Sequence, residues 1–195
     1  MRFDFFLEEE SMRAFLQEFL PRLLGSDVHA LLDIHFHVHQ GKRDLMQSLP
    51  KKIRAYSSFP SNTIFVVLHD QDSSDCKKLK AEISSLFVGT EIPYLVRISC
   101  RELENWYLGS IRDFATLNPR LNISSLQGKA KYRDPDSLAG WEEAQKLLGE
   151  ASNNYLSKVR LASEFGKIIN MENNNSNSFN AFVNGIKKFV ESLDK

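Results

Sequence analysis

The first half of the chain alternates between short apolar runs and segments in which apolar residues recur every three or four positions. The apolar runs predict buried strands at 3–7, 28–40, 63–68 and 93–99. The periodic segments between them predict helices. The run TIFVVL at 63–68 has no polar alternation, which is typical of a strand covered on both faces. We therefore expect an α/β fold with a mainly parallel four-stranded sheet and flanking helices.

Polar residues, glycine and proline suggest where the helices of this half begin and end. Ser11 is a favourable N-cap for the first helix, and Gly25 ends it. Pro21 lies inside that pattern and predicts a kink or an early end. After the third strand, Asp72 or Ser74 could cap the next helix.

The pattern changes after Gly109, because no further strand is predicted. Helical spacing recurs at 141–148, 155–169 and 179–193, and the polar stretch NNNSNS at 173–178 predicts a linker or cap before the last helix. We therefore expect an α/β domain at 1–109 and a helical extension at 110–195 that packs on it.

Composition narrows the class of protein. The chain has 195 residues, with 25 Lys and Arg against 25 Asp and Glu, and zero net charge argues against coating nucleic acid by bulk electrostatics. Its two cysteines have no CxxC spacing, so they predict neither a disulfide framework nor a cysteine zinc site. No apolar run is long enough to span a bilayer, and acids stand where a signal peptide would be apolar, so we expect a cytoplasmic protein without a membrane partner.

Familiar catalytic motifs are missing from the sequence. It contains no GxxxxGK[ST], no GxGxxG and no Ser-His-Asp order, which excludes P-loop, dinucleotide-binding and serine hydrolase sites at the level of motifs.

Acidic residues follow three of the four predicted strands. Glu8 ends the first strand, Asp70 and Asp72 follow the third, and Glu102 and Glu104 follow the fourth. Ligands of open parallel sheets bind at the carboxyl ends of the strands, so these acids would share one edge. Carboxylates brought together need a cation, and oxygen ligands suit Mg²⁺ or Mn²⁺. The sequence thus suggests a metal site at Glu8, Asp70 and Asp72, with Glu102 and Glu104 as candidates for a second metal.

Each acidic group also has an ordinary structural explanation. The acids at 8–10 precede a helix, where they meet its dipole favourably. Asp72 could be a cap, and Glu102 and Glu104 could be solvent-facing residues of a first helical turn. It is the joint placement of the three groups that favours a metal site.

Basic residues offer candidate contacts for a nucleic-acid backbone. Lys42 and Arg43 follow the second strand and would lie at the same edge as the acids. Lys129, Lys131 and Arg133 form a loop cluster in which Tyr132 could stack on a base. Further candidates are Lys158 and Arg160. Any of these could equally be an ordinary solvated side chain.

Histidines alternate along the second predicted strand. His35, His37 and His39 would point to one face, where His-x-His could bind zinc or form a polar stripe beneath a helix or near a nucleic-acid groove. The polar stripe is the favoured reading. His69 should point away from Asp70, and it could reach a phosphate where the strand ends.

A strand-ending Glu followed by Asp-x-Asp after a hydrophobic strand resembles the Toprim signature of topoisomerases, DnaG-type primases and OLD-type nucleases. More closely, the chain resembles a bacterial Toprim-like family labelled a domain of unknown function, numbered four-two-seven-six. Six blocks in order carry the resemblance over nearly the whole chain: LEEESM with LPRLL downstream, HQGKRDLMQSLP, VVLHDQDSSDCKKLK, CRELENWYLG, KYRDPDSL and NSNSFNAFVNGI.

The resemblance implies a Toprim-like fold and a divalent-metal-dependent nuclease. Glu8, Asp70 and Asp72 would hold Mg²⁺ or Mn²⁺, and Glu8 would act as acid or base. Toprim enzymes usually have glycine after this Glu, whereas Glu9 stands here. Similar genes lie beside ATPases in anti-phage loci, which implies an effector with an ATPase partner. The alternative is a catalytically inactive Toprim-like module that binds or regulates a partner.

Overall fold

The computed structural model describes residues 1–57 and 63–191 and has a four-stranded, all-parallel sheet. Its strands are β1 (Arg2–Leu7), β2 (Asp33–Val38), β3 (Thr63–Asp70) and β4 (Tyr94–Ser99). Their order across the sheet is β2-β1-β3-β4, so β1 and β3 are central. The predicted α/β fold class is confirmed, including the parallel sheet and its flanking helices.

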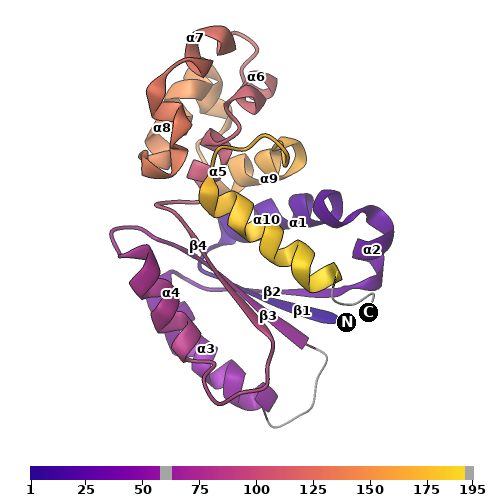
Figure 1. Cartoon of the computed structure of the whole chain (residues 1–195). Coiled ribbons are helices and arrows are strands. Elements are labelled where there is room, and N and C mark those ends of the chain that lie inside the picture. Colours follow the sequence, from indigo (N-terminus) through magenta and orange to yellow (C-terminus); the bar gives the residue numbers. More distant parts are fainter. Residues whose placement is uncertain (58–62, 192–195) are drawn as a thin grey trace.

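Helices cover both faces of this sheet (Figure 1). On one face lie α3 (Lys42–Ser57) and α4 (Cys76–Ser85), which pack against Phe6, Phe65 and Val67. The other face packs against α1 (Glu10–Leu24) and α10 (Asn177–Glu191), and α9 (Lys158–Ile168) lies against α1. Alternate residues of the central strands therefore belong to two separate apolar clusters, one on each face of the sheet, and β3 is buried throughout.

The chain order of the strands creates a switch point between β1 and β3. The chain leaves β1 into α1 on one face of the sheet and leaves β3 into α4 on the other. In open parallel sheets, ligands bind at the carboxyl ends of strands whose chains depart to opposite faces. Glu8 directly follows β1 and Asp70 ends β3, so both lie at this switch point.

Two predicted elements of the N-terminal half differ in the structure. The apolar run from position 28 predicted a strand, but 26–31 form the short helix α2 (Ser26–Leu31) and the strand begins only at Asp33. Pro21 does not end α1, which continues to Leu24. The Pro21 ring falls in the last turns of α1, where packing of Phe19 and Leu20 in the core holds the helix.

The N-caps also differ from prediction. Glu9, not Ser11, occupies the cap position of α1, and the buried Ser11 donates its hydroxyl to the Glu9 carboxylate. Asp75 caps α4 by accepting a hydrogen bond from the Lys78 backbone at 2.8 Å, in place of Asp72 or Ser74.

Residues after Gly109 contain helices only, within the described part of the chain. Besides α9 and α10, this region and its entry contain the following short elements: α5 (Glu104–Leu108), η1 (Ile111–Asp113), α6 (Phe114–Leu117), α7 (Ile123–Gln127), η2 (Ala130–Arg133), η3 (Pro135–Ser137), α8 (Gly140–Leu148) and η4 (Gly149–Asn154). Figure 1 shows α6, α7 and α8 standing away from the sheet, beyond α5.

The helical region is joined to the sheet by close packing. A Cβ at Gly166 would lie 2.5 Å from the Phe15 carbonyl oxygen, so glycine lets α9 approach the α1 backbone. Arg22 of α1 donates to the carbonyl oxygens of Gly166 and Ile169 at 2.7 and 3.0 Å. Arg97 of β4 donates to the Ala181 carbonyl of α10 at 2.9 Å. The boundary at 109/110 stays a prediction, because one apolar cluster runs across it.

No helix among residues 1–57 and 63–191 is both long and apolar enough to cross a membrane.

Candidate active site at the carboxyl edge of the sheet

Glu8 is held in one orientation by its neighbours at the switch point. Its Oε2 accepts a hydrogen bond from the Asp70 backbone at 2.9 Å and lies 2.8 Å from Nδ1 of His69. Burial alone would raise the pKa of Glu8, but bonds from His69 and from the Asp70 and Lys42 backbone outweigh it and lower that pKa. Glu8 is therefore an oriented anion at neutral pH.

His69 supports Glu8 and is not available to substrate. Its side chain is fully buried, and its Nδ1 is paired with Glu8. The prediction that His69 could reach a phosphate is therefore wrong, because the ring is not exposed.

Asp70 is a buried carboxylate surrounded by like charge. Its Oδ1 accepts a hydrogen bond from the Ser99 hydroxyl at 2.8 Å. Burial, and then the negative charges of Glu104, Glu9 and Glu8, raise the pKa of Asp70 well above its usual range. No Lys, Arg or His forms an ion pair with Asp70 in the described part of the protein. The arrangement thus lacks a positive charge at this point.

Glu104 is a second buried carboxylate, at the start of α5. Burial raises the pKa of Glu104 to about 7, although Lys158 opposes the shift. Its Oε2 lies 3.5 Å from the Lys158 ammonium, while Oε1 is buried without a hydrogen-bond partner among the described residues. The Tyr107 hydroxyl, one turn further on, is also buried and unpartnered there. Such atoms are rare in folded proteins and mark places where a further group can bind.

Asp72 and Glu102 lie at the outer rim. Asp72 is exposed and has φ of +51°, a left-handed conformation unusual for a residue other than glycine. Its backbone donates to the Arg101 carbonyl at 2.9 Å, and Arg101 has φ of +61°. Burial of part of the side chain, and then the charge of Glu8, raise the pKa of Asp72. Glu102 accepts from Lys158 at 3.1 Å.

Glu9 and Lys158 also belong to this site, although neither was predicted for it. The charge of Glu9 acts on both Asp70 and Glu104. Lys158, which was considered for nucleic acid, instead pairs with Glu102 and Glu104 and lies 5.8 Å from the centre of the Trp141 ring. Glu9 could have been included because it follows Glu8. Nothing in the sequence connects position 158 to position 104, so only the structure shows that Lys158 lies beside Glu104.

The predicted acids therefore meet at one edge, which we call the carboxylate edge; its members are Glu8, Glu9, Asp70, Asp72, Glu102 and Glu104. Over residues 1–57 and 63–191, no three acidic, histidine or cysteine side chains are close enough to form a ready-made metal site. The donors are nonetheless all oxygens, one is buried and unpartnered, and burial together with like charge raises the pKa of Asp70. This chemistry fits a hard divalent cation.

The predicted basic residues are divided between two places. Lys42 begins α3 beside Glu8, and its ammonium donates to the Ser74 hydroxyl at 3.2 Å, while Arg43 is exposed next to it. Lys129 is exposed in the helical region, and Lys131 pairs with Glu143 at 2.5 Å. The prediction that Tyr132 stacks on a base is wrong, because its ring is 3% exposed and its hydroxyl donates to Glu143.

The alternating histidines form a polar stripe. His37 lies 2.5 Å from the Asp4 carboxylate, His35 lies 2.7 Å from Asp33, and His39 lies 2.9 Å from the Leu7 carbonyl. The His37 ring stacks on Phe6 with centroids 4.8 Å apart. Each ring thus has a partner within the protein, as the polar-stripe reading expects. Both cysteines are free thiols.

Comparison with known proteins places the fold and the family. No curated protein matches the chain. Among solved structures, the chain is similar to the C-terminal region of the Burkholderia pseudomallei OLD protein, with a TM-score of 0.56 and 19% sequence identity over 96% of this chain and 98% of that one. At this identity the likeness shows a shared, Toprim-like fold. The model of the family described as "Domain of unknown function (DUF4276)" matches residues 7–187, and the chain therefore belongs to that family.

Proposed function

We propose that the protein is a divalent-metal-dependent nuclease that hydrolyses phosphodiester bonds at the carboxylate edge. The main support for this proposal is Asp70, a buried carboxyl at the switch point whose pKa is raised by burial and then by the charges of Glu104, Glu9 and Glu8. Buried acids without a positive partner are common at functional sites, and a bound cation would neutralise their charge.

Glu8, Asp70 and Asp72 would hold Mg²⁺ or Mn²⁺, and Glu104 and Glu102 are the candidates for a second ion. A bound divalent ion would polarise the phosphodiester and stabilise charge that develops on the phosphoryl oxygens. Glu8 is anionic and fixed by His69 and the Asp70 backbone, so it is suited to accept a proton from the attacking water. Lys158 reduces the negative charge of Glu102 and Glu104 that would otherwise repel a phosphate.

Nucleic acid, DNA or RNA, is the proposed substrate, and an ATPase encoded nearby is the proposed partner in anti-phage defence. Lys42 and Arg43 support the first part, because they place positive charge beside Glu8 at the same edge. The partner rests on the family resemblance.

A second candidate function is a Toprim-like binding or regulatory module without catalysis. Glu9 in the place of the usual glycine and the pairing of Lys158 with Glu102 and Glu104 support it, since both alter the electrostatics that a metal would meet. An acidic edge of this kind could instead bind a basic segment of a partner.

A cleavage assay separates the two functions. The purified chain is incubated with supercoiled DNA, single-stranded DNA and RNA in Mg²⁺, Mn²⁺ or EDTA, with and without the neighbouring ATPase. A nuclease cleaves only with metal, and cleavage disappears in Glu8→Gln and Asp70→Asn. The matched control is Glu82→Gln, an exposed acid on α4, which should cleave like the wild type. Inactivity of the wild type even with the ATPase would contradict the nuclease and support the module.

A further inference from the structure

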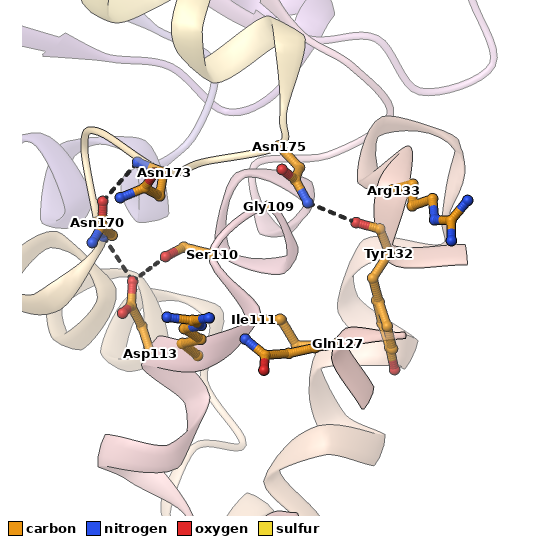
Figure 2. Close-up of a pocket in the computed structure, with 11 residues that line it drawn as sticks. Gly109, Ser110, Ile111, Asp113, Gln127, Tyr132, Arg133, Asn170, Asn173 and Asn175 are labelled. Atoms are coloured by element: carbon orange, nitrogen blue, oxygen red, sulfur yellow. Dashed lines mark hydrogen bonds between the residues drawn. The ribbon is translucent and has the colours of Figure 1, made fainter. Parts of the chain in front are cut away.

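A polar pocket of about 410 Å³ lies in the helical region, apart from the carboxylate edge. Its walls come from three segments far apart in sequence, 109–113, 127–133 and 170–175. Figure 2 shows these segments facing one cavity, with Asp113 and Asn170 on one side and Tyr132 and Arg133 on the other.

Hydrogen bonds hold the walls of this pocket in place. Asp113 accepts from the Asn170 backbone at 2.7 Å and from the Ser110 hydroxyl. Asn175 donates from its backbone to the Gly109 carbonyl at 2.9 Å and from its side chain to the Tyr132 carbonyl at 3.1 Å (Figure 2). The pocket is therefore largely pre-formed.

Gly109 and the polar stretch at 173–178 are built for this geometry. A Cβ at Gly109 would lie 1.9 Å from Oδ1 of Asn174, so only glycine lets the two segments approach. Asn174 is buried and donates to the Trp106 carbonyl at 3.0 Å, and buried Ser176 donates to Asp136 at 2.6 Å. The exposed Asn173 and Asn175 line the pocket instead. The stretch is thus a pocket wall as well as the lead-in to α10.

The lining combines positive charge with amide groups. Arg112 and Arg133 are exposed, and neither forms an ion pair with an acid in the described ranges. Asp113 is already bonded to Ser110 and Asn170. The Gln127 amide lies next to the Arg112 guanidinium, and with its oxygen and nitrogen exchanged its oxygen accepts from Arg112 at 2.8 Å. Guanidinium groups bind phosphates or guanine, and Asn and Gln amides bind base edges.

We propose that this pocket binds one nucleotide unit of the nucleic-acid strand that the carboxylate edge cleaves, which rests on the proposed function. The helix α5 connects the two places, since Glu104 begins it and Gly109 follows it. At about 1.5 Å per residue, the backbone of Gly109 lies about 7.5 Å along the axis from Glu104. This separation is shorter than a strand of a few nucleotides, so one strand could contact both places.

The test measures binding without cleavage, by fluorescence anisotropy of labelled single-stranded DNA and RNA oligonucleotides in EDTA. Arg112→Ala should weaken binding by about tenfold, because it removes a charge-assisted hydrogen bond. Asn173→Ala should weaken it less. The matched controls are Arg120→Ala, whose side chain is 85% exposed, and Asn153→Ala, both outside the pocket, which should bind like the wild type. Thermal melts confirm that every variant folds.

Two results would overturn the inference. One is equal binding by pocket and control variants. The other is that free nucleoside monophosphates bind to the pocket while the oligonucleotide does not. That result would assign the pocket to a free nucleotide instead of a strand.

The inference and the proposed function fail separately. Binding in EDTA is measured without cleavage, so the comparison of Arg112→Ala with the wild type tests the pocket whether or not the protein cleaves. If the protein binds oligonucleotides through Arg112 but never cleaves them, the proposed nuclease function is refuted and the proposed binding pocket is retained. A protein that cleaves normally with Arg112→Ala and binds unchanged would refute the pocket alone.

Discussion

Two buried aspartates of the same sheet have opposite electrostatic surroundings. Asp4 lies in β1 and accepts hydrogen bonds from Arg2 at 2.7 and 2.9 Å, and His37 lies 2.5 Å away. Burial disfavours its charge, but His37 and Arg2 outweigh burial and lower the pKa of Asp4 to about 2. Asp70, at the carboxyl end of β3, has Ser99 and is otherwise surrounded by acids that raise its pKa. Burial with paired charge supports the fold, whereas burial with like charge indicates a binding site.

The largest effect expected from this contrast is on activity at Asp70. Asp70→Asn removes one metal ligand, so cleavage should fall by about a hundredfold or more. The same change relieves repulsion, so the free energy of unfolding should stay equal or increase. Cleavage rates and urea unfolding measure the two quantities. A strongly destabilised Asp70→Asn that retained activity would reverse the assignment.

Asp4→Asn should show the opposite behaviour. It leaves Arg2 and His37 without their buried partner, and the free energy of unfolding should fall by about 3 kcal/mol. Cleavage per folded molecule should not change, because Asp4 pairs with His35 and Phe65 in the strand register and lies away from the carboxylate edge. Loss of activity in folded Asp4→Asn would place Asp4 in the site and erase the contrast.

Acid titration tests Asp4 without mutation. A folded-state pKa of about 2, below the usual 3.8, gives stability that is fully present above pH 3.8 and is lost as pH falls towards 2. The expected loss is about 2 kcal/mol, at about 1.4 kcal/mol per pKa unit. Urea unfolding of the wild type and Asp4→Asn between pH 5 and pH 2 measures it. Parallel curves for the two proteins would show that Asp4 has no such role.

The smallest expected effect concerns Glu104. Its contribution to stability depends on pH in the opposite direction to that of Asp4. Its pKa of about 7 is above the usual 4.5, so its contribution to stability is present below pH 4.5 and is lost as pH rises to about 7. Divalent metal competes with that proton, so Mn²⁺ affinity should increase by about tenfold from pH 6 to pH 8. Calorimetry at both values measures it, and Glu104→Gln should flatten the dependence. An affinity that falls with rising pH would exclude Glu104 as a ligand.

Most of the sheet was predictable from the sequence, because strands covered on both faces appear as short, continuous apolar runs. It mispredicted 28–32, where Val28, Leu31 and Leu32 are apolar but too few to separate a strand from a short helix. The meeting of Glu8 with Asp70 was predictable, since parallel strands end at one edge. The difference between Asp4 and Asp70 was not, because it depends on Arg2, His37 and Ser99, whose contacts exist only after folding.

We propose that acids from separate strands hold one divalent ion at the switch point. The decisive experiment is a crystal structure of the wild-type chain soaked in Mn²⁺, with anomalous scattering used to locate the ion. We expect manganese bound by oxygens of Glu8, Asp70 and Asp72, at about 2 Å as hard six-coordinate cations require. Manganese found only elsewhere, with Lys158 still paired to Glu104 and the three carboxylates apart, would refute this metal site.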